Sequence, residues 1–517
     1  MADFSELLAD ESRSLTERMI KTLANLTLLF ALMAIAHGHV NAQTAEPDAY
    51  KIAFEPGNTR LMKVEAKLTA ASDIFEMSEY GAEQFPGRWA EFVRDLRAFG
   101  ANGKPIEVKG LGDAKWRISV KPGDKVRLNY DVLLDHDKHK WAAGIDSVSF
   151  VRDWGVYASG RTYFITNGPR SGKTSVTFDL PKGWNVTTPW PADKGGRHSF
   201  TARDAADLTE SMIFAGTHKE FVIARDGFEL VFAIGSEELF AQEDRYRSLA
   251  NGVMDYYIKL MGGVPKPPPS NPFSRSVVIV NPGEQTDGEV IGNNICIIVG
   301  SNSDPMSDLF ARFIFAHEFF HLWNGKSIRP RNTEDEWFKE GFTNIYAMKA
   351  LYRIGAVSEA ELFGVLDGLF YKRYSTDESY AKASMRDVAG GDEKHKHWGL
   401  IYGGGMFAGL CIDTEIRRAS GNERSLDDLM RAFYSRYSGS DRTYVTDDLK
   451  TAMSSLSKSD LNGFFTDHIY GAKPVPIDRC LNSAGLRAEI ADGRLKVSRK
   501  PDASAAEERM IAGLLGK

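Results

Sequence analysis

Cysteine is scarce in this chain. Its 517 residues include only three cysteines, Cys296, Cys411 and Cys480. They are too few and too widely spaced for a disulfide framework or a CxxC metal site, and at most one disulfide can form. Any metal site must therefore use histidine and carboxylate ligands, which suit zinc as well as thiolates do.

An excess of charge of one sign is also absent. The chain has 64 basic and 70 acidic residues, a formal net charge of -6, and no long block of lysine and arginine. Nucleic-acid-binding proteins carry a basic patch or stripe. The composition therefore argues against nucleic acid as a partner.

Long apolar runs are missing, with one exception near the N-terminus. There a basic stretch (18–21) precedes the apolar residues 23–36, and the small residue Ala42 follows. This pattern predicts a secretory signal peptide over residues 1–42, for which Met19 is an alternative start. A membrane anchor is the other interpretation, but the run is shorter than the roughly 20 apolar residues of a spanning helix. We therefore expect export to the periplasm or out of the cell, and no membrane span in the mature chain.

Short strand-like runs fill the region after the signal peptide. WRISV (116–120) and TSVTFDL (174–180) are examples, and turns rich in Gly, Pro, Asn and Asp separate such runs. Beyond Ser303 the patterns are mostly helical. The sequence predicts an α+β multidomain protein with a β-rich N-terminal domain over residues 43–225.

The first chemical motif, HEFFH, lies in a predicted helix over residues 305–324. Asp304 and Pro305 supply an N-cap and a first helical position, and Gly325 supplies a C′ glycine. Most of the other positions are apolar, so we expect the helix to be buried.

Two histidines and a glutamate share this helix. His317 and His321 are four residues apart, so both imidazoles can reach one tetrahedral ion from the same helix face. Glu318 is placed to face the metal-bound water, as a general base requires. A core helix that carries HExxH by chance is the alternative.

A third ligand is predicted on a second helix, over residues 333–355, which opens with a capping box of Thr333 and Glu336. Within it, Glu340 follows His321 after eighteen residues, and a helix–turn–helix brings it back to the histidines. Two histidines and one glutamate leave a fourth position open for water, which is typical of a catalytic zinc site.

Other metal patterns fail on spacing. A metzincin requires glycine and histidine where this chain has Asn324 and Ser327. A di-iron bundle requires two ExxH motifs, and the sequence has only the one from Glu318 to His321. A zinc hydrolase remains.

The two helices together resemble a known family. HEFFHLWNGKSIRP (317–330) and WFKEGFTNIY (337–346) resemble the HExxHxWNxKxxRP and WxxEGxT motifs of the glycyl aminopeptidases, zinc metallopeptidases with a thermolysin-like catalytic domain. The resemblance implies such a mostly helical zinc-peptidase domain over residues 226–486. The family often ends in a PDZ domain, but only 31 residues follow residue 486, so we expect residues 487–517 to form a C-terminal tail.

The same resemblance implies residue roles. His317, His321 and Glu340 match the ligands of one zinc ion, and Glu318 matches the base that activates water. The segment 401–421 resembles a family segment with a Tyr-x-Lys-Gly core, which implies that Tyr402 donates a hydrogen bond to the tetrahedral intermediate. A buried helix tyrosine is the alternative.

Two positions depart from the family pattern. Gly404 stands where the lysine of Tyr-x-Lys-Gly is expected, and the stretch 286–300 lacks a GGLEH-like motif. In related aminopeptidases the glutamate of that motif binds the free amine of the substrate. Glu284 or Glu289 can replace it, but a solvated loop is the ordinary interpretation of both.

Several polar residues have two interpretations. Thr343 and Asn344 either hydrogen-bond a ligand histidine or lie on the helix surface. The segment 392–398, with His395 and His397, is either a solvated loop or a border of the cleft. Four motif residues are interpreted as locking the turn after the first helix: Trp323, Asn324, Lys326 and Arg329.

The sequence as a whole predicts a zinc-dependent peptidase. The leading hypothesis is an aminopeptidase that releases small N-terminal residues, Gly or Ala, from peptide substrates by attack of a Glu-activated, zinc-bound water. One alternative is a zinc endopeptidase with relaxed N-terminal specificity. The other is a zinc-containing peptide-binding protein without turnover.

Overall fold

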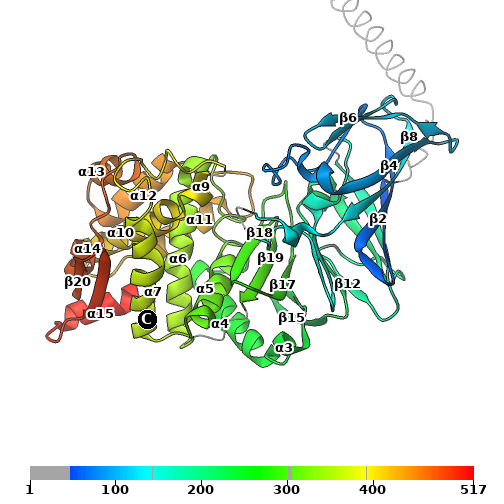
Figure 1. Cartoon of the computed structure of the whole chain (residues 1–517). Coiled ribbons are helices and arrows are strands. Elements are labelled where there is room, and N and C mark those ends of the chain that lie inside the picture. The colour runs from blue at the N-terminus through cyan, green and yellow to red at the C-terminus, as the bar shows by residue number, and fades with distance from the viewer. Residues whose placement is uncertain (1–46, 142–143, 169–170, 301–304, 392, 517) are drawn as a thin grey trace, which may run out of the picture. The chain divides into compact units, whose positions relative to one another are not determined.

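Strands dominate the first part of the chain and helices the second (Figure 1). The computed structural model describes residues 47–141, 144–168, 171–300, 305–391 and 393–516. The predicted signal peptide (1–42) and the predicted N-cap Asp304 lie outside the described residues. The predicted α+β order, a β-rich region followed by a helical one, is confirmed.

Three sheets form the N-terminal region. The seven-stranded sheet has the order β13 (Ser199–Asp204), β11 (Ser171–Asp179), β1 (Ala49–Glu55), β2 (Asn58–Thr69), β8 (Lys125–Leu133), β4 (Val93–Gly100) and β5 (Pro105–Ile106). The four-stranded sheet has the order β12 (Asn185–Thr187), β14 (Met212–Gly216), β10 (Gly155–Ser159) and β9 (Phe150–Arg152). The three-stranded sheet consists of β3 (Ile74–Glu76), β7 (Lys115–Ile118) and β6 (Val108–Gly112). Strand β8 buries every second residue because successive side chains of a strand point to opposite faces.

A five-stranded mixed sheet supports the helical region. Its order is β15 (Lys219–Arg225), β16 (Phe228–Ile234), β17 (Arg275–Gly283), β19 (Asn294–Gly300) and β18 (Asp287–Ile291). The predicted domain boundary after residue 225 divides the β15–β16 hairpin, because Asp226 and Gly227 form a tight turn with φ of 47° and 81°. Strand β18 lies at the edge of this sheet and pairs antiparallel with β19.

The longer helices carry the site and its support. They are α4 (Glu243–Met261), α5 (Pro305–Phe320), α6 (Glu336–Arg353), α10 (Gly405–Ala419), α11 (Leu426–Tyr437) and α12 (Thr446–Ser457). Shorter helices are α2 (Ala205–Thr209), α3 (Glu237–Phe240), α7 (Glu359–Val365), α8 (Lys372–Ser375), α9 (Glu393–Lys396), α13 (Asn462–Phe464) and α14 (Ile477–Ser483). The π-helical turns of the described residues are η5 (Leu366–Tyr371), η6 (Gly399–Gly404) and η7 (Phe465–Ile469). The 3₁₀ turns are η1 (Arg88–Phe92), η2 (His136–Lys138), η3 (Gly160–Thr162) and η4 (Thr333–Asp335).

Helix boundaries differ from the predictions at two points. Helix α5 ends at Phe320, four residues before the predicted end at 324. The predicted capping box of Thr333 and Glu336 does not form, because the Glu336 carboxylate binds two lysines instead and α6 follows the 3₁₀ turn η4.

Helices α6 and α10 touch at the level of their backbones. A Cβ added to Gly341 would lie 2.6 Å from the Gly405 Cα and against the Met406 nitrogen. A Cβ on Gly405 would in turn meet the Trp337 carbonyl. The backbones of these two helices are therefore so close at Gly341 and Gly405 that neither position has space for a side chain.

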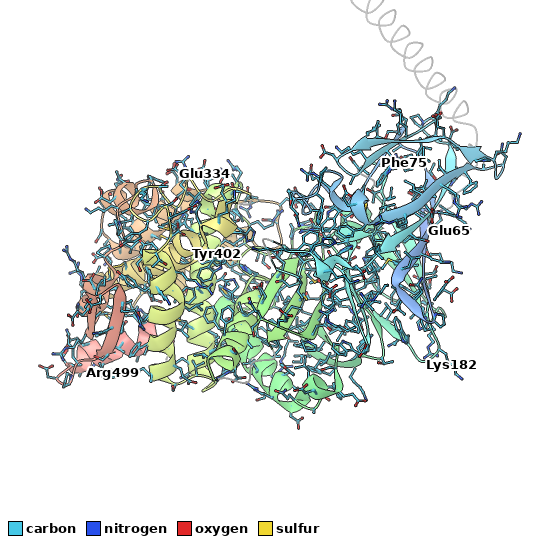
Figure 2. All side chains as sticks on the ribbon, in the orientation of Figure 1. Glu65, Phe75, Lys182, Glu334, Tyr402 and Arg499 are labelled. Atoms are coloured by element: carbon cyan, nitrogen blue, oxygen red, sulfur yellow. A yellow bond between two sulfur atoms is a disulfide. The ribbon has the colours of Figure 1, made fainter. Side chains whose placement is uncertain are left out.

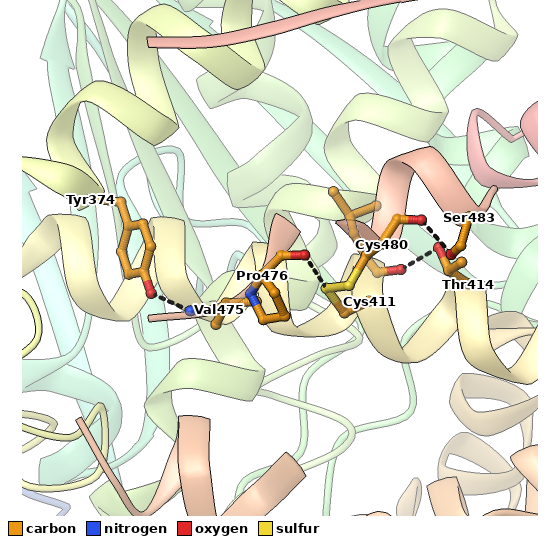
Figure 3. Close-up of a disulfide and its surroundings, with 8 residues drawn as sticks. Tyr374, Cys411, Thr414, Val475, Pro476, Cys480 and Ser483 are labelled. Carbon is orange, nitrogen blue, oxygen red and sulfur yellow. Dashed lines mark hydrogen bonds between the residues drawn. A yellow bond between two sulfur atoms is a disulfide. The ribbon is translucent and has the colours of Figure 1, made fainter. Parts of the chain in front are cut away.

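One disulfide ties the helical region together. Cys411 on α10 is bonded to Cys480 on α14 (Figure 3), which uses the single bridge that three cysteines permit, and Cys296 is free and buried.

The predicted C-terminal tail contains regular secondary structure. Residues 487–517 contain most of the hairpin β20 (Leu486–Ala491) and β21 (Arg494–Arg499), and then α15 (Ala505–Leu514). The buried guanidinium of Arg417 donates to the Gly513 carbonyl at 3.0 Å, and Ile511 is fully buried. None of the described helices is long and apolar enough to cross a membrane.

Candidate metal centre

Helices α5 and α6 bring the three predicted ligands together. The Nε2 atoms of His317 and His321 lie 3.0 Å apart. The Oε2 atom of Glu340 lies 3.4 Å from the first and 3.2 Å from the second. All three side chains are buried, at 5%, 8% and 3% exposure.

This geometry fits a tetrahedral metal ion. Ligands about 2.0–2.1 Å from a tetrahedral ion are about 3.3 Å from one another, close to the separations observed. The Glu340 Oε2 atom is buried and has no hydrogen-bond partner among the described residues. A buried carboxylate oxygen without a partner is costly, and a metal ion at this point would satisfy it. These are the only three His, Cys, Asp or Glu residues that meet as a possible metal site within the described chain.

Hydrogen bonds fix the ring orientation and the tautomer of both histidines. His317 donates from Nδ1 to Asn344 Oδ1 at 2.7 Å, and His321 donates from Nδ1 to the Asn324 carbonyl at 3.1 Å. Both acceptors are carbonyl-type oxygens, so the Nδ1 atoms carry the protons and the Nε2 lone pairs are left for the metal. The Asn344 amide nitrogen donates to the Tyr402 carbonyl at 3.1 Å, which fixes the orientation of that amide.

Two lysines hold the other oxygen of the third ligand. The Lys394 ammonium lies 3.1 Å from Glu340 Oε1 and 2.9 Å from Glu336 Oε2. Lys339 lies 3.4 Å from Glu340 Oε1 and also binds Glu336. Burial alone would raise the pKa of Glu340, but Lys394, His321 and Lys339 outweigh it and hold that pKa well below its usual range. The carboxylate is therefore ionised, as a ligand must be. No sequence pattern predicted a role for either lysine.

Glu318 lies beside the three ligands. Its Oε1 atom is 3.9 Å from His317 Nε2, and its side chain is 5% exposed. Burial, and then the negative charges of Glu289 and Glu340, raise the pKa of Glu318 well above its usual value. A general base needs a pKa raised in this direction, toward the working pH.

Tyr402 (labelled in Figure 2) borders the same cavity. Its ring stacks on Trp398 with centroids 4.8 Å apart and lies 6.1 Å from the His317 ring. Burial and the Glu340 carboxylate raise the pKa of Tyr402 well above its usual value, so the phenol keeps its proton and can donate a hydrogen bond. The role assigned to Tyr402 stays a prediction.

The missing lysine at position 404 has a steric explanation. Residue 404 ends the π-helical turn η6, and a Cβ there would lie 3.0 Å from the Tyr374 ring and 3.1 Å from Met385 Sδ. A lysine at this position would require the Tyr374 ring and the Met385 side chain to shift. Lys394 instead places an ammonium group 6.0 Å from the centre of the Tyr402 ring.

The site opens into a cavity of about 310 Å³. Asp287 and Glu289 of β18 line it, together with the metal-site residues and the aromatic side chains Phe310, Phe313 and Trp398. Glu289 is thus a cavity residue on a strand, which corrects its interpretation as a solvated loop carboxylate, whereas Glu284 is exposed.

A further carboxyl group lies behind this acidic wall. Asp146, from the loop after β8, is fully buried, and neither of its carboxyl oxygens has a hydrogen-bond partner among the described residues. Burial, then Asp287 and Glu289, raise its pKa well above the usual value. Burial likewise raises the pKa of Asp287 to about 6. Asp146 thus lies close to the two carboxyl groups of β18 without lining the cavity, and no sequence spacing predicted this proximity.

The structure decides between the remaining interpretations. Asn344 contacts a ligand histidine as predicted, whereas Thr343 accepts from the Asn324 amide. Lys394, His395 and Trp398 line the cavity, so the described part of this segment, residues 393–398, borders the cleft and the solvated-loop interpretation is wrong. Three motif residues do lock the turn after α5: Trp323 donates to the Gly263 carbonyl, Asn324 to the Lys339 carbonyl, and Arg329 to the Ser440 carbonyl.

Comparisons with known proteins agree with this architecture. Residues 49–217 match the model of the Peptidase M61 N-terminal domain, and residues 311–392 match the model of the M61 glycyl aminopeptidase. The fold is similar to the crystal structure of an aminopeptidase N family protein from Idiomarina loihiensis, with a TM-score of 0.70 and 16% identity over 86% of this chain and 79% of that one. At this identity the likeness shows the fold alone. No curated protein matches the sequence.

The predicted resemblance is confirmed in both parts of the chain. The N-terminal model covers the three sheets that precede β15, and the second model covers α5, α6 and the three candidate ligands. The strand-rich region and the helical region thus each contain a segment that matches a model of the same peptidase family, the M61 glycyl aminopeptidases.

Proposed function

We propose that the protein is a zinc-dependent aminopeptidase that releases small N-terminal residues from peptides. The observation that carries the proposal is the convergence of His317, His321 and Glu340 on one point with Oε2 unsatisfied. Two histidines and one carboxylate with an open fourth position are the ligand set of catalytic zinc.

Glu318 is the proposed general base. Bound zinc would supply Lewis-acid chemistry, polarising the peptide carbonyl and making a water molecule acidic. Glu318 takes the proton of that water and later passes it to the leaving amine. The Tyr402 hydroxyl donates to the oxygen that gains negative charge in the transition state.

The acidic side of the cavity supports recognition of a free amine. Asp287 and Glu289 face the same space as the metal ligands. An ammonium group is the natural partner for clustered carboxylates. The cavity of about 310 Å³ lies at the lower limit of ligand pockets, which supports small N-terminal residues.

An endopeptidase is the second candidate function. The stretch 286–300 lacks the GGLEH-like motif. Without a dedicated amine-binding group, the same chemistry would act on internal bonds.

The test uses one alanine-leading peptide with a free or an acetylated amino terminus, with and without chelator. An aminopeptidase cleaves only the free form, and the chelator abolishes cleavage. Cleavage of both forms would favour the endopeptidase. Binding of zinc without cleavage of either form would favour a peptide-binding protein.

Export of the chain remains part of the proposal. The Cys411–Cys480 disulfide supports it, because disulfides persist in oxidising compartments outside the cytosol. Fractionation of the producing cells, with the N-terminus of the mature protein sequenced, tests both location and cleavage after Ala42.

A further inference from the structure

Lys326 is the one residue in the turn motif whose side chain has no part in locking the turn. It lies next to Gly325 in the turn after α5, and its side chain lines the cavity that holds the metal ligands. Its backbone N–H donates to the His321 carbonyl at 3.0 Å. Its ammonium group makes no hydrogen bond or ion pair to any described residue.

The other cations of this cavity are already engaged. Lys339 and Lys394 neutralise Glu336 and Glu340. The Arg373 guanidinium lies 4.7 Å above the Trp398 ring. Lys326 is therefore the cavity-lining ammonium group that the described chain leaves without a partner.

The surroundings of Lys326 favour an anionic ligand. Burial, and then the neighbouring cations Lys339 and Arg161, lower its pKa, while Glu210 and Glu289 act in the opposite direction. Lys326 is half-buried, and an ammonium group without a protein partner in a cavity can bind an incoming carboxylate with a charge-assisted hydrogen bond. The buried Nε of Arg161 also has no hydrogen-bond partner among the described residues, which adds positive potential near the same place.

A short peptide carries both charges that this cavity accepts. Its amine is complementary to the carboxyl groups of β18, and a carboxylate beyond the scissile bond is complementary to Lys326. The cavity volume of about 310 Å³ suits a substrate of a few residues.

We propose that Lys326 binds a carboxylate on the leaving-group side of the substrate, which makes short peptides with a carboxylate beyond the scissile bond the preferred substrate class. This inference rests on the proposed peptidase function. The carboxylate can come from the C-terminus of a dipeptide or tripeptide or from an acidic side chain, and the chemistry of the contact is the same.

Binding and turnover are measured separately, so that the two proposals can fail independently. Binding is measured by calorimetry on the zinc-loaded Glu318→Gln protein, which is not expected to turn the peptides over. The ligands are Gly-Ala-Ala, its C-terminal amide, and Gly-Glu-Ala amide. Turnover of the same peptides is measured on the wild-type enzyme.

The expected result is that Gly-Ala-Ala binds at least about tenfold more tightly than its amide, because a hydrogen bond between charged groups is lost in the amide. Adding Lys326→Met reduces this ratio to near one, whereas Lys326→Arg keeps it clearly above one. Arg373→Met, which removes another positive charge from the same cavity, keeps the wild-type ratio.

Each alternative result has one meaning. Tight binding of Gly-Glu-Ala amide that Lys326→Met abolishes supports the carboxylate contact and identifies a side chain as its source. Equal affinities for all three peptides, a preference for a carboxylate-bearing peptide that is unchanged in Lys326→Met, or no binding of any peptide would overturn the inference. Clear acid preference in binding with no turnover by the wild type would overturn the peptidase proposal alone.

Discussion

Helix α6 carries a buried charged cluster near each end, and the two clusters differ in one respect. Near the C-terminal end, Lys349 is fully buried and lies 3.3 Å from Asp413 and 3.2 Å from Asp427. Arg417 lies 3.2 Å from Asp413, so every charge in this cluster has an opposite charge beside it. Near the N-terminal end, Glu340 has lysines at one oxygen, whereas its other oxygen lies beside two histidine nitrogens and has no hydrogen-bond partner among the described residues.

The difference separates a structural cluster from a functional one. Burial alone would raise the pKa of Asp413, but Lys349 and Arg417 outweigh it and lower that pKa, so Asp413 stays ionised. The cluster at Glu340 has a remaining bonding position that only a ligand can fill. Burial and charge are common to both, so the unfilled position is what identifies the site.

The sharpest test of this contrast is Glu318→Gln. We expect turnover to fall by about 10²–10⁴-fold, because the base is lost, while one equivalent of zinc stays bound. Turnover rates and metal content of the purified variant are measured together. His321→Ala is the matched variant, which should lose the metal. Turnover near wild type in Glu318→Gln would refute its role as base.

Breaking the structural cluster should affect stability instead. We expect Lys349→Met to lower the free energy of unfolding by about 3–5 kcal/mol, because Asp413 loses a buried partner. Urea unfolding measures this change. Lys450→Met removes a surface ion pair with Asp447, and its effect should stay below about 1 kcal/mol. Equal effects of the two variants would mean that the buried cluster contributes no more than a surface pair.

A smaller effect is expected at the hydrogen bond that orients His317. Asn344→Ala removes the acceptor at 2.7 Å and should weaken zinc binding by about 10–100-fold. Competition with a chelator of known affinity measures the change. Thr343→Ala, one residue away, removes a hydroxyl that contacts Asn324 and no ligand histidine, so it should retain the wild-type affinity. Loss of affinity in both variants would indicate general damage to α6.

The smallest effect concerns pH. Burial raises the pKa of Asp287 in the folded protein to about 6 from an ordinary 3.8. The stability that this group contributes is therefore fully present below pH 3.8 and is lost as the pH rises through 6. Asp287→Asn should increase the free energy of unfolding at pH 8 relative to pH 4.5, measured at fixed zinc concentration. Asp492→Asn, on an exposed turn, should show no such difference. If the free energy of unfolding changed with pH in the same way in both variants, burial would not raise the pKa of Asp287.

The sequence predicted the parts of the site that lie on regular helices. His317 and His321 share a helix face by spacing alone, and Glu340 sits on the next helix, so a helix–turn–helix was enough to unite them. The family motifs added the fold class, which the strand-to-helix order confirms.

What the sequence did not predict comes from distant or irregular segments. Lys394 lies on the short helix α9, 54 residues after Glu340, and no periodicity connects the two. Asp146 reaches the acidic wall from the N-terminal region. The ordered C-terminus depends on the Arg417 contact to the Gly513 carbonyl, a pairing across 96 residues that no local pattern reveals.

The backbone contact between Gly341 and Gly405 also limits how this site can change. Glu340 immediately precedes one glycine, and Tyr402 lies three residues before the other. A metal ligand and the proposed oxyanion donor are therefore carried by two helices that meet without side chains between them. Engineering of specificity can alter the walls of the cavity residue by residue. A side chain placed at either glycine would instead push the two helices apart and so increase the distance between the ligand and the donor. The spacing of the catalytic groups and the preference for a substrate can therefore be changed independently in this fold.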